Sequence, residues 1–256
     1  MFPFPFNPFL AFYYYFQYCS AATQTGPDAL ASQYALATST SMPYPSTTMS
    51  TTDTQALLVS EWSLGKGRIQ DGPENLAFVD DPFPTKPPPG TTSPTGPVLQ
   101  VTYAQGSFSH DTGGAQLYTL WNTTDGSSFD TMMVTYELAF DAGFDWVKGG
   151  KLPGIRGGLN STGCSGGNQA NGQDCFSSRL MWRMDGAAEG ALYALYPCFF
   201  EILILIQSTR ISPRRTICVL AKESSAILTL VSAFREAPLL LSADSEFVSF
   251  TMYVLH

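Results

Sequence analysis

ELAFDAGFDWVKGGKLPGIRGG, residues 137–158, opens the stretch that decides the fold of this chain. The stretch continues through CFSSRLMWRMDG at 175–186 and ends in ALYALYP at 191–197. Residues 131–140 predict a strand, because β-branched and aromatic residues dominate them and turn residues flank them. The dense glycines of residues 143–158 exclude a helix and predict a backbone that lies close to another strand or to a ligand.

Two further strands are predicted after this glycine-rich segment. Residues 176–183, FSSRLMWR, alternate between two faces. One face is expected to be open and to carry Ser177, Arg179, Met181 and Arg183, while Ser178, Leu180 and Trp182 suit a core. Residues 191–196 predict a third strand paired to the second, with Tyr193 and Leu195 on one face and Tyr196 on the other.

Basic, hydroxyl and phenol side chains with few acids suit an anionic ligand. Arginine can bind a carboxylate with two hydrogen bonds. A nearby arginine also lowers the pKa of a lysine or tyrosine, which helps either residue to act as a base. β-Elimination from a uronic acid needs these groups: one neutralises the carboxylate, one removes the C5 proton, and one protonates the leaving oxygen. A glycoside hydrolase needs two facing carboxylates instead, and no such pair is indicated. The plainer alternative is a solvated strand face.

Several ordered motifs resemble polysaccharide lyase family 14 and the similar glucuronan lyases. They are WVKGGKLPG, CSGG, CFSSRLMWRMDG and YALYP, preceded by SLGKGRIQDGPENLAFVDDPFP at 63–84 and VLQVTYAQGSFSHDTGGAQLYTLW at 98–121. The resemblance covers roughly residues 60–197. It implies an all-β jelly-roll sandwich with a substrate groove on its concave sheet, and β-elimination of a uronate polymer such as alginate or glucuronan.

The resemblance also implies the catalytic residues. Lys151 matches the lysine of the GGKLPG motif, Ser177 and Arg179 match a serine–arginine pair two residues apart, and Tyr193 matches the first of two tyrosines. Leu195 stands at the second tyrosine position and Tyr196 follows one residue later, so Tyr196 reaches the site only if a bulge intervenes. Substrate-binding candidates are Lys148, Arg156 and Arg183. No metal or organic cofactor is implied.

Composition agrees with a secreted β protein. The formal net charge of −8 argues against nucleic acid as a partner, and 22 glycines with 18 prolines fit a turn-rich sandwich. Cys164 and Cys175 flank a Gly/Asn-rich loop; with only two histidines in the chain, a disulfide is favoured over zinc, which implies an oxidising compartment. Asn122 and Asn160 begin glycosylation sequons.

The N-terminal region divides into two segments. Residues 1–22 are apolar and aromatic, too short and proline-broken for a membrane span, and typical of a signal peptide that lacks its basic start; a hydrophobic tail is the alternative. Residues 23–54 are rich in Ser, Thr, Ala and Pro and predict a disordered linker. The folded jelly roll is expected over residues 55–197.

Residues 198–256 lack the expected further motifs, so the jelly roll is predicted to be incomplete or altered there. A shifted reading frame or unspliced sequence is one hypothesis, because codon degeneracy over residues 224–240 permits a family-like Cys-Asn and Arg-Gly-Ser-Phe. A divergent but genuine C-terminal region is the other. Loss of the later strands would expose sheet edges and predicts an unstable, weakly active product.

Three functions remain open from the sequence. The first is a secreted polysaccharide lyase that acts on an anionic uronan. The second is a non-catalytic carbohydrate-binding jelly roll, which Leu195 favours. The third is a structural cell-surface protein carried by the Ser/Thr-rich segment, which predicts no affinity for uronate polymers.

Overall fold

The computed structural model describes most of the chain from Pro27 to Leu255. The residues described are 27–62, 64, 68–82, 84, 96–107, 112–120, 129–140, 144, 146, 149–157, 164, 174–184, 188–193, 201–206, 214–226, 229–233 and 244–255. From residue 188 onward the description rests on backbone pairing.

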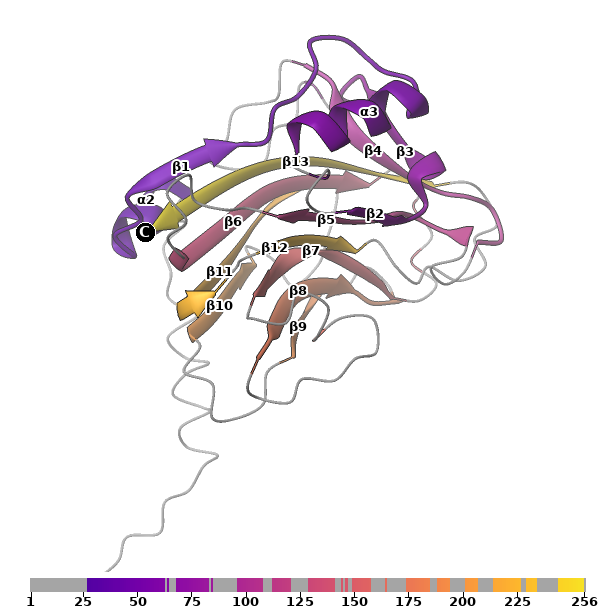
Figure 1. Cartoon of the computed structure of the whole chain (residues 1–256). Helices are drawn as coiled ribbons and strands as arrows, with labels where there is room; N and C mark the ends of the chain where they lie inside the picture. The colour runs from indigo at the N-terminus through magenta and orange to yellow at the C-terminus, as the bar shows by residue number, and fades with distance from the viewer. Residues whose placement is uncertain are drawn as a thin grey trace, which may run out of the picture.

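Short helices lie near the N-terminus, and strands make up the rest of the described secondary structure (Figure 1). In chain order the elements are α2 (Pro27–Gln33), β1 (Thr38–Ser41), α3 (Thr51–Glu61), β2 (Arg68–Asp71), η1 (Pro73–Asn75), β3 (Leu76–Val79), β4 (Val98–Tyr103), β5 (Gln116–Leu120), β6 (Phe129–Phe140), β7 (Gly150–Gly157), β8 (Phe176–Trp182), β9 (Ala188–Tyr193), β10 (Glu201–Ile206), β11 (Arg214–Ala226), β12 (Thr229–Ala233) and β13 (Asp244–Leu255).

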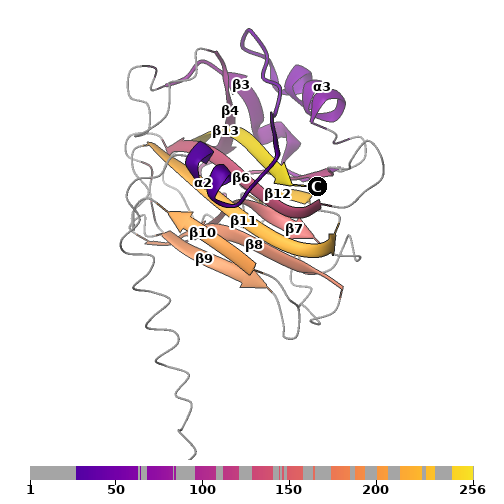
Figure 2. The same cartoon turned by 90° about the vertical axis from the view of Figure 1, so that its left-hand side faces the viewer.

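The strands form two antiparallel sheets that are layered face to face (Figures 1 and 2). The seven-stranded sheet has the order β10-β11-β6-β13-β4-β3, with β1 paired to β13. The six-stranded sheet has the order β2-β5-β12-β7-β8-β9. Neighbours in each sheet are mostly distant in sequence, as in a Greek-key or jelly-roll connection. The predicted all-β sandwich is therefore confirmed.

The core between the sheets follows from strand alternation. Even-numbered residues of β6 face inward: Met132, Val134, Tyr136, Leu138 and Phe140 all belong to the main core cluster. Facing side chains of the six-stranded sheet include Leu117, Leu152, Ile155, Phe176, Leu180 and Trp182. Trp182 also meets Phe140 and Tyr103 edge-on, at centroid distances of 5.6 and 5.8 Å, which is a favourable geometry for aromatic rings.

Helix α3 covers the β3 edge of the seven-stranded sheet. Ser50 caps its N-terminus by accepting a hydrogen bond from the Asp53 backbone N–H, a typical N-cap contact. The buried Thr54 accepts a hydrogen bond of 3.1 Å from the Phe78 backbone N–H of β3. The helix thus satisfies a backbone donor on a strand that has a neighbour on only one side.

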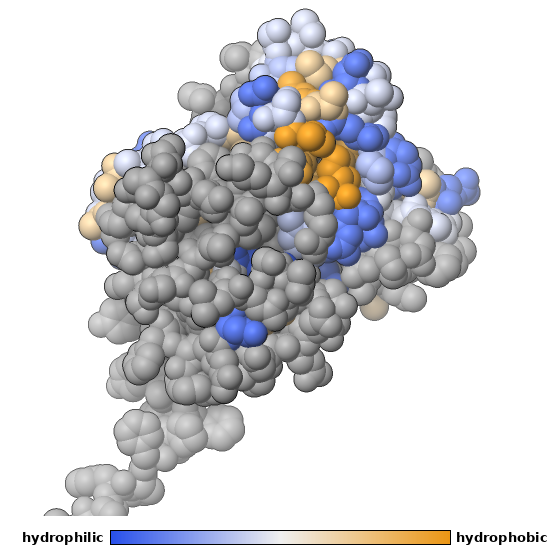
Figure 3. Space-filling view, in the orientation of Figure 1, coloured by the Kyte–Doolittle hydropathy of each residue, from blue (hydrophilic) through white to orange (hydrophobic). Residues whose placement is uncertain are grey.

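A hydrophobic side chain is also exposed on this helix. Val59 of α3 has an exposed fraction of 46%. Figure 3 shows hydrophobic colours gathered near the top of the molecule, in the region of α3, with hydrophilic residues around them. No helix among the described residues is long and apolar enough to cross a membrane.

Residues 27–54 differ from the disordered linker that their composition predicts. Strand β1 pairs with β13 from Thr38↔Val254 to Ser41↔Thr251. Helix α2 packs on the outer face of the seven-stranded sheet, where Leu30 and Ala31 bury against Met133 (Figure 2). A few apolar residues suffice here because the segment adds to an existing sheet and builds no core of its own.

The C-terminal region also differs from the predicted loss of strands. β11 pairs with β6 and β10, β13 lies between β6 and β4, and β12 lies between β5 and β7. Both sheets therefore contain strands from residues 201–255 at central positions. Alternation of side chains is weak over these residues, and the sequence therefore did not indicate strands. Strands can still pair there, because backbone pairing depends only partly on side-chain identity. The reading-frame hypothesis stays untested by this pairing.

Candidate functional site

The candidate site is built on β7, β8 and β9, whose registers place the predicted residues in rows across the sheet. One row joins Arg156, Ser177 and Tyr193. The next joins Gly154, Arg179 and Ala191, and a third joins Lys151, Met181 and Glu189. Directly opposed residues of an antiparallel pair share a face. The predicted neighbourhood of Lys151, Ser177 and Arg179 therefore exists in the backbone register.

A β-bulge in β7 brings Lys151 to this face. Lys151 pairs with Met181 and Gly154 pairs with Arg179, so β7 advances three residues while β8 advances two. Strict alternation back from Arg156 would place Lys151 on the opposite face. The extra residue at Leu152–Pro153 reverses that phase.

Two glycines allow the strands to approach this closely. A Cβ at Gly154 would overlap the Ser178 carbonyl oxygen and the Arg179 backbone, and a Cβ at Gly150 would overlap the Trp182 ring. The glycines of the GGKLPG motif therefore lie against a neighbouring strand and a core side chain, which is one of the two explanations that the sequence offers.

The face that carries the site is buried, which corrects the prediction of an open face. Arg156, Ser177 and Arg179 have exposed fractions of 2%, 2% and 4%. Lys151 is partly exposed. Hydrophobic alternation predicts which residues share a face but not what covers that face, so it could not predict this burial.

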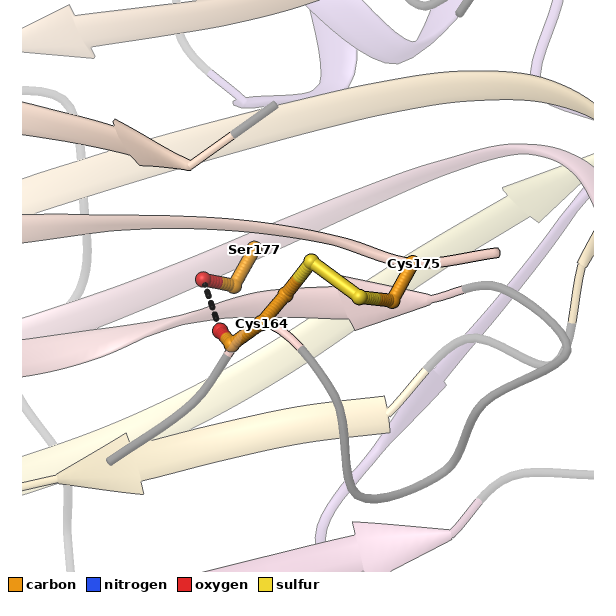
Figure 4. The surroundings of a disulfide bond; sticks show 3 residues. All are labelled: Cys164, Cys175 and Ser177. Atoms are coloured by element: carbon orange, nitrogen blue, oxygen red, sulfur yellow. Dashed lines mark hydrogen bonds between the residues drawn. A yellow bond between two sulfur atoms is a disulfide. The ribbon is translucent and has the colours of Figure 1, made fainter. Parts of the chain in front are cut away.

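The Cys164–Cys175 disulfide accounts for part of this cover. The two cysteines are bonded, with Cα atoms 5.8 Å apart, so the predicted pairing is present in the structure. The Ser177 hydroxyl donates a hydrogen bond of 2.7 Å to the Cys164 carbonyl oxygen (Figure 4). The disulfide thus fixes a loop residue directly over the catalytic serine candidate.

Two residues of β5 extend the site and were missed in the sequence. Tyr118 pairs with Val231 of β12, which pairs with Gly154, so Tyr118 lies in the row of Arg179. The guanidinium carbon of Arg156 lies 5.8 Å from the centroid of the Tyr118 ring. Gln116 donates a side-chain hydrogen bond to the Tyr118 hydroxyl, and both residues are buried. The motif AQLYTLW contains them, but only β12 connects β5 to β7, and β12 was not predicted.

The other predicted site residues are less central or lie outside the described residues. Arg183 follows the end of β8, is exposed, and lies beside Gly149 rather than in the rows of the site. Outside the described residues lie Lys148, Tyr196, Asn122 and Asn160. Within the described part of the chain, His, Cys, Asp and Glu side chains do not gather in groups of three that could hold a metal ion.

Solved alginate lyases have a similar structure. The marine PL-14 alginate lyase from Aplysia kurodai aligns with a TM-score of 0.56 at 20% identity, over 85% of this chain and 98% of that one. An alginate lyase from a Chlorella virus aligns with a TM-score of 0.41 at 17% identity, over 65% of this chain and 88% of the other. At such identity the likeness to the Aplysia enzyme shows the fold alone, and it confirms the predicted jelly roll.

A family match covers the part of the chain that carries the site. No curated protein sequence matches this chain. Residues 91–207, however, match the family model described as polysaccharide lyase 14. This range contains β4 to β10 and every described candidate of the site. Over residues 91–207 the chain therefore matches polysaccharide lyase family 14, as its motifs indicate.

Proposed function

We propose that this protein is an extracellular polysaccharide lyase that cleaves a uronic-acid polymer by β-elimination. The observation that carries the proposal is the shared face of β7 and β8, where register places Lys151, Arg156, Ser177 and Arg179 in adjacent rows. The family match over residues 91–207 supports the reaction class. The disulfide supports an oxidising, extracellular setting.

Each residue type has a role in this chemistry. Arg179, with Arg156 beside it, neutralises the uronate carboxylate and so stabilises the negative charge that develops when C5 loses its proton. Lys151 or Tyr193 removes the C5 proton. The electron pair forms the C4–C5 double bond, the C4–O bond breaks, and Tyr193 or Tyr196 protonates the leaving oxygen. Ser177 positions the sugar.

The proposal is tested with the full chain, alginate and glucuronan, by following the ultraviolet absorbance of the unsaturated uronate product. We expect the absorbance to rise with the wild-type protein. The rate of this rise should be at least about a hundredfold lower in Lys151→Ala and in Arg179→Ala, because each variant lacks a group that transfers a proton or stabilises transition-state charge. Thr54→Val is the matched control, because it removes a buried hydrogen bond between α3 and β3, and β3 belongs to the other sheet. Equal rates in all four proteins would contradict the assignment.

A non-catalytic carbohydrate-binding protein is the second candidate. The burial of Ser177 and Arg179, together with the hydrogen bond from Ser177 to Cys164, favours it, because neither group is open to a polymer in this arrangement. Leu195 at the second tyrosine position favours it as well. This candidate predicts that the folded chain binds the polymer without producing unsaturated ends, and that Lys151→Ala and Arg183→Ala, which remove cations with exposed surface, weaken binding.

A further inference from the structure

The bulge of β7 decides which face of the sheet receives Lys151. Leu152 and Ile155 both belong to the core cluster although they are three residues apart, and strict alternation would separate them. Their shared burial is the side-chain consequence of the register shift between Lys151 and Gly154. Without the extra residue, Lys151 would face the core and Leu152 would take its place beside Met181.

A side chain from the opposite sheet holds this bulge. Tyr136 lies in β6 and is 1% exposed, and its hydroxyl donates a hydrogen bond of 2.9 Å to the Pro153 carbonyl oxygen. A bulge takes backbone groups out of the ladder, and proline has no N–H to return to it. A buried carbonyl outside the ladder needs another donor, which Tyr136 supplies across the core.

We propose that Tyr136 is a positioning residue for Lys151: its hydroxyl clamps the Pro153 carbonyl and so keeps the bulge that turns the lysine toward Arg179 and Ser177. The inference rests on the proposed function, in which Lys151 takes part in proton removal. Tyr136 itself points into the core and touches no substrate. Tyr136 acts on Lys151 through the short backbone segment between Lys151 and Pro153. A small displacement of this segment would misplace the lysine and slow the proton transfer.

The test compares Tyr136→Phe with Thr54→Val in the full chain. Both variants lose one buried hydrogen bond, but only the first loses a contact to β7. For Tyr136→Phe we expect kcat on the uronate polymer to fall about tenfold or more, with KM within about twofold, because substrate binding is kept and the lysine is misplaced. Backbone amides of the peptide 150–157 should also exchange hydrogen about tenfold faster. Thr54→Val should change neither quantity.

Two results would overturn the proposal: an unchanged kcat and exchange rate in Tyr136→Phe, or losses of equal size in both variants. The exchange measurement needs no turnover. If the wild-type protein cleaves no uronan, the proposed function fails. Faster exchange of peptide 150–157 in Tyr136→Phe alone would then still support the clamp, and unchanged exchange would reject it.

Discussion

At the scale of single residues, Gly154 determines how closely β7 approaches β8. A methyl group there would overlap the Ser178 carbonyl oxygen and the Arg179 backbone, so the two strands would have to separate. We expect Gly154→Ala to lower the free energy of unfolding by about 1–3 kcal/mol, which is the usual range for overpacking. It should also remove activity, because Arg179 moves. Denaturant unfolding measures the first effect.

Gly96→Ala is the matched control for this substitution. Among the described residues, a Cβ there would meet the Pro45 carbonyl oxygen at 3.8 Å, an ordinary contact. Its free energy of unfolding should stay within about 0.5 kcal/mol of the wild-type value, as for most surface substitutions. Equal losses in the two variants would show that the close approach of β7 and β8 does not limit stability.

The ring of Tyr118 is expected to support Arg156. The guanidinium lies over the ring at 5.8 Å, a contact that contributes about 0.5–2 kcal/mol. We expect Tyr118→Leu to lower kcat/KM on the uronate polymer roughly two- to thirtyfold, which is that energy converted to a rate. Tyr118→Phe keeps the ring and should stay close to wild type. Steady-state kinetics measure both variants. If kcat/KM fell as far in Tyr118→Phe as in Tyr118→Leu, the role would belong to the hydroxyl.

At the scale of elements, the disulfide joins the loop before β8 to the start of that strand. Its removal in Cys164→Ser/Cys175→Ser should lower the free energy of unfolding by about 2–4 kcal/mol, the usual effect of opening a short loop. Thermal unfolding with and without a reductant checks this prediction. The reductant should lower the Tm of the wild-type protein and leave the double variant unchanged. A reductant-insensitive wild type would contradict it.

The sequence predicted a strand and its faces correctly where hydrophobic alternation was strong. It did not predict features that depend on how a strand pairs with its neighbours. The residues of β8 predicted both its core face, with Leu180 and Trp182, and the common face of Ser177 and Arg179. The bulge of β7 is a property of two strands in register, so no pattern within GGKLPG predicts it. The roles of Gln116 and Tyr118 depend on β12, which lies more than a hundred residues later in the chain.

At the scale of the whole molecule, the N-terminal segment and the C-terminal strands depend on each other. β1 covers part of β13, and α2 covers Met133 of β6. A chain that begins at Met42 would lose both elements, expose part of the edge of β13 and uncover Met133. Compared with a chain that begins at Pro27, we expect its free energy of unfolding to fall by about 2–5 kcal/mol, for two or three lost apolar contacts. Equal urea midpoints for the two chains would show that residues 27–41 do not stabilise the fold, as expected of the disordered linker predicted from composition.

The central claim is that the shared face of β7 and β8 carries out β-elimination on a uronic-acid polymer, and product mass tests it most directly. A lyase leaves an unsaturated uronate at the new non-reducing end, so its oligosaccharides weigh one water less than the products of hydrolysis. Mass spectrometry of alginate and glucuronan digests should therefore show unsaturated ends with the wild-type chain and none with Arg179→Ala. Saturated ends, or unsaturated ends that persist in Arg179→Ala, would contradict the account.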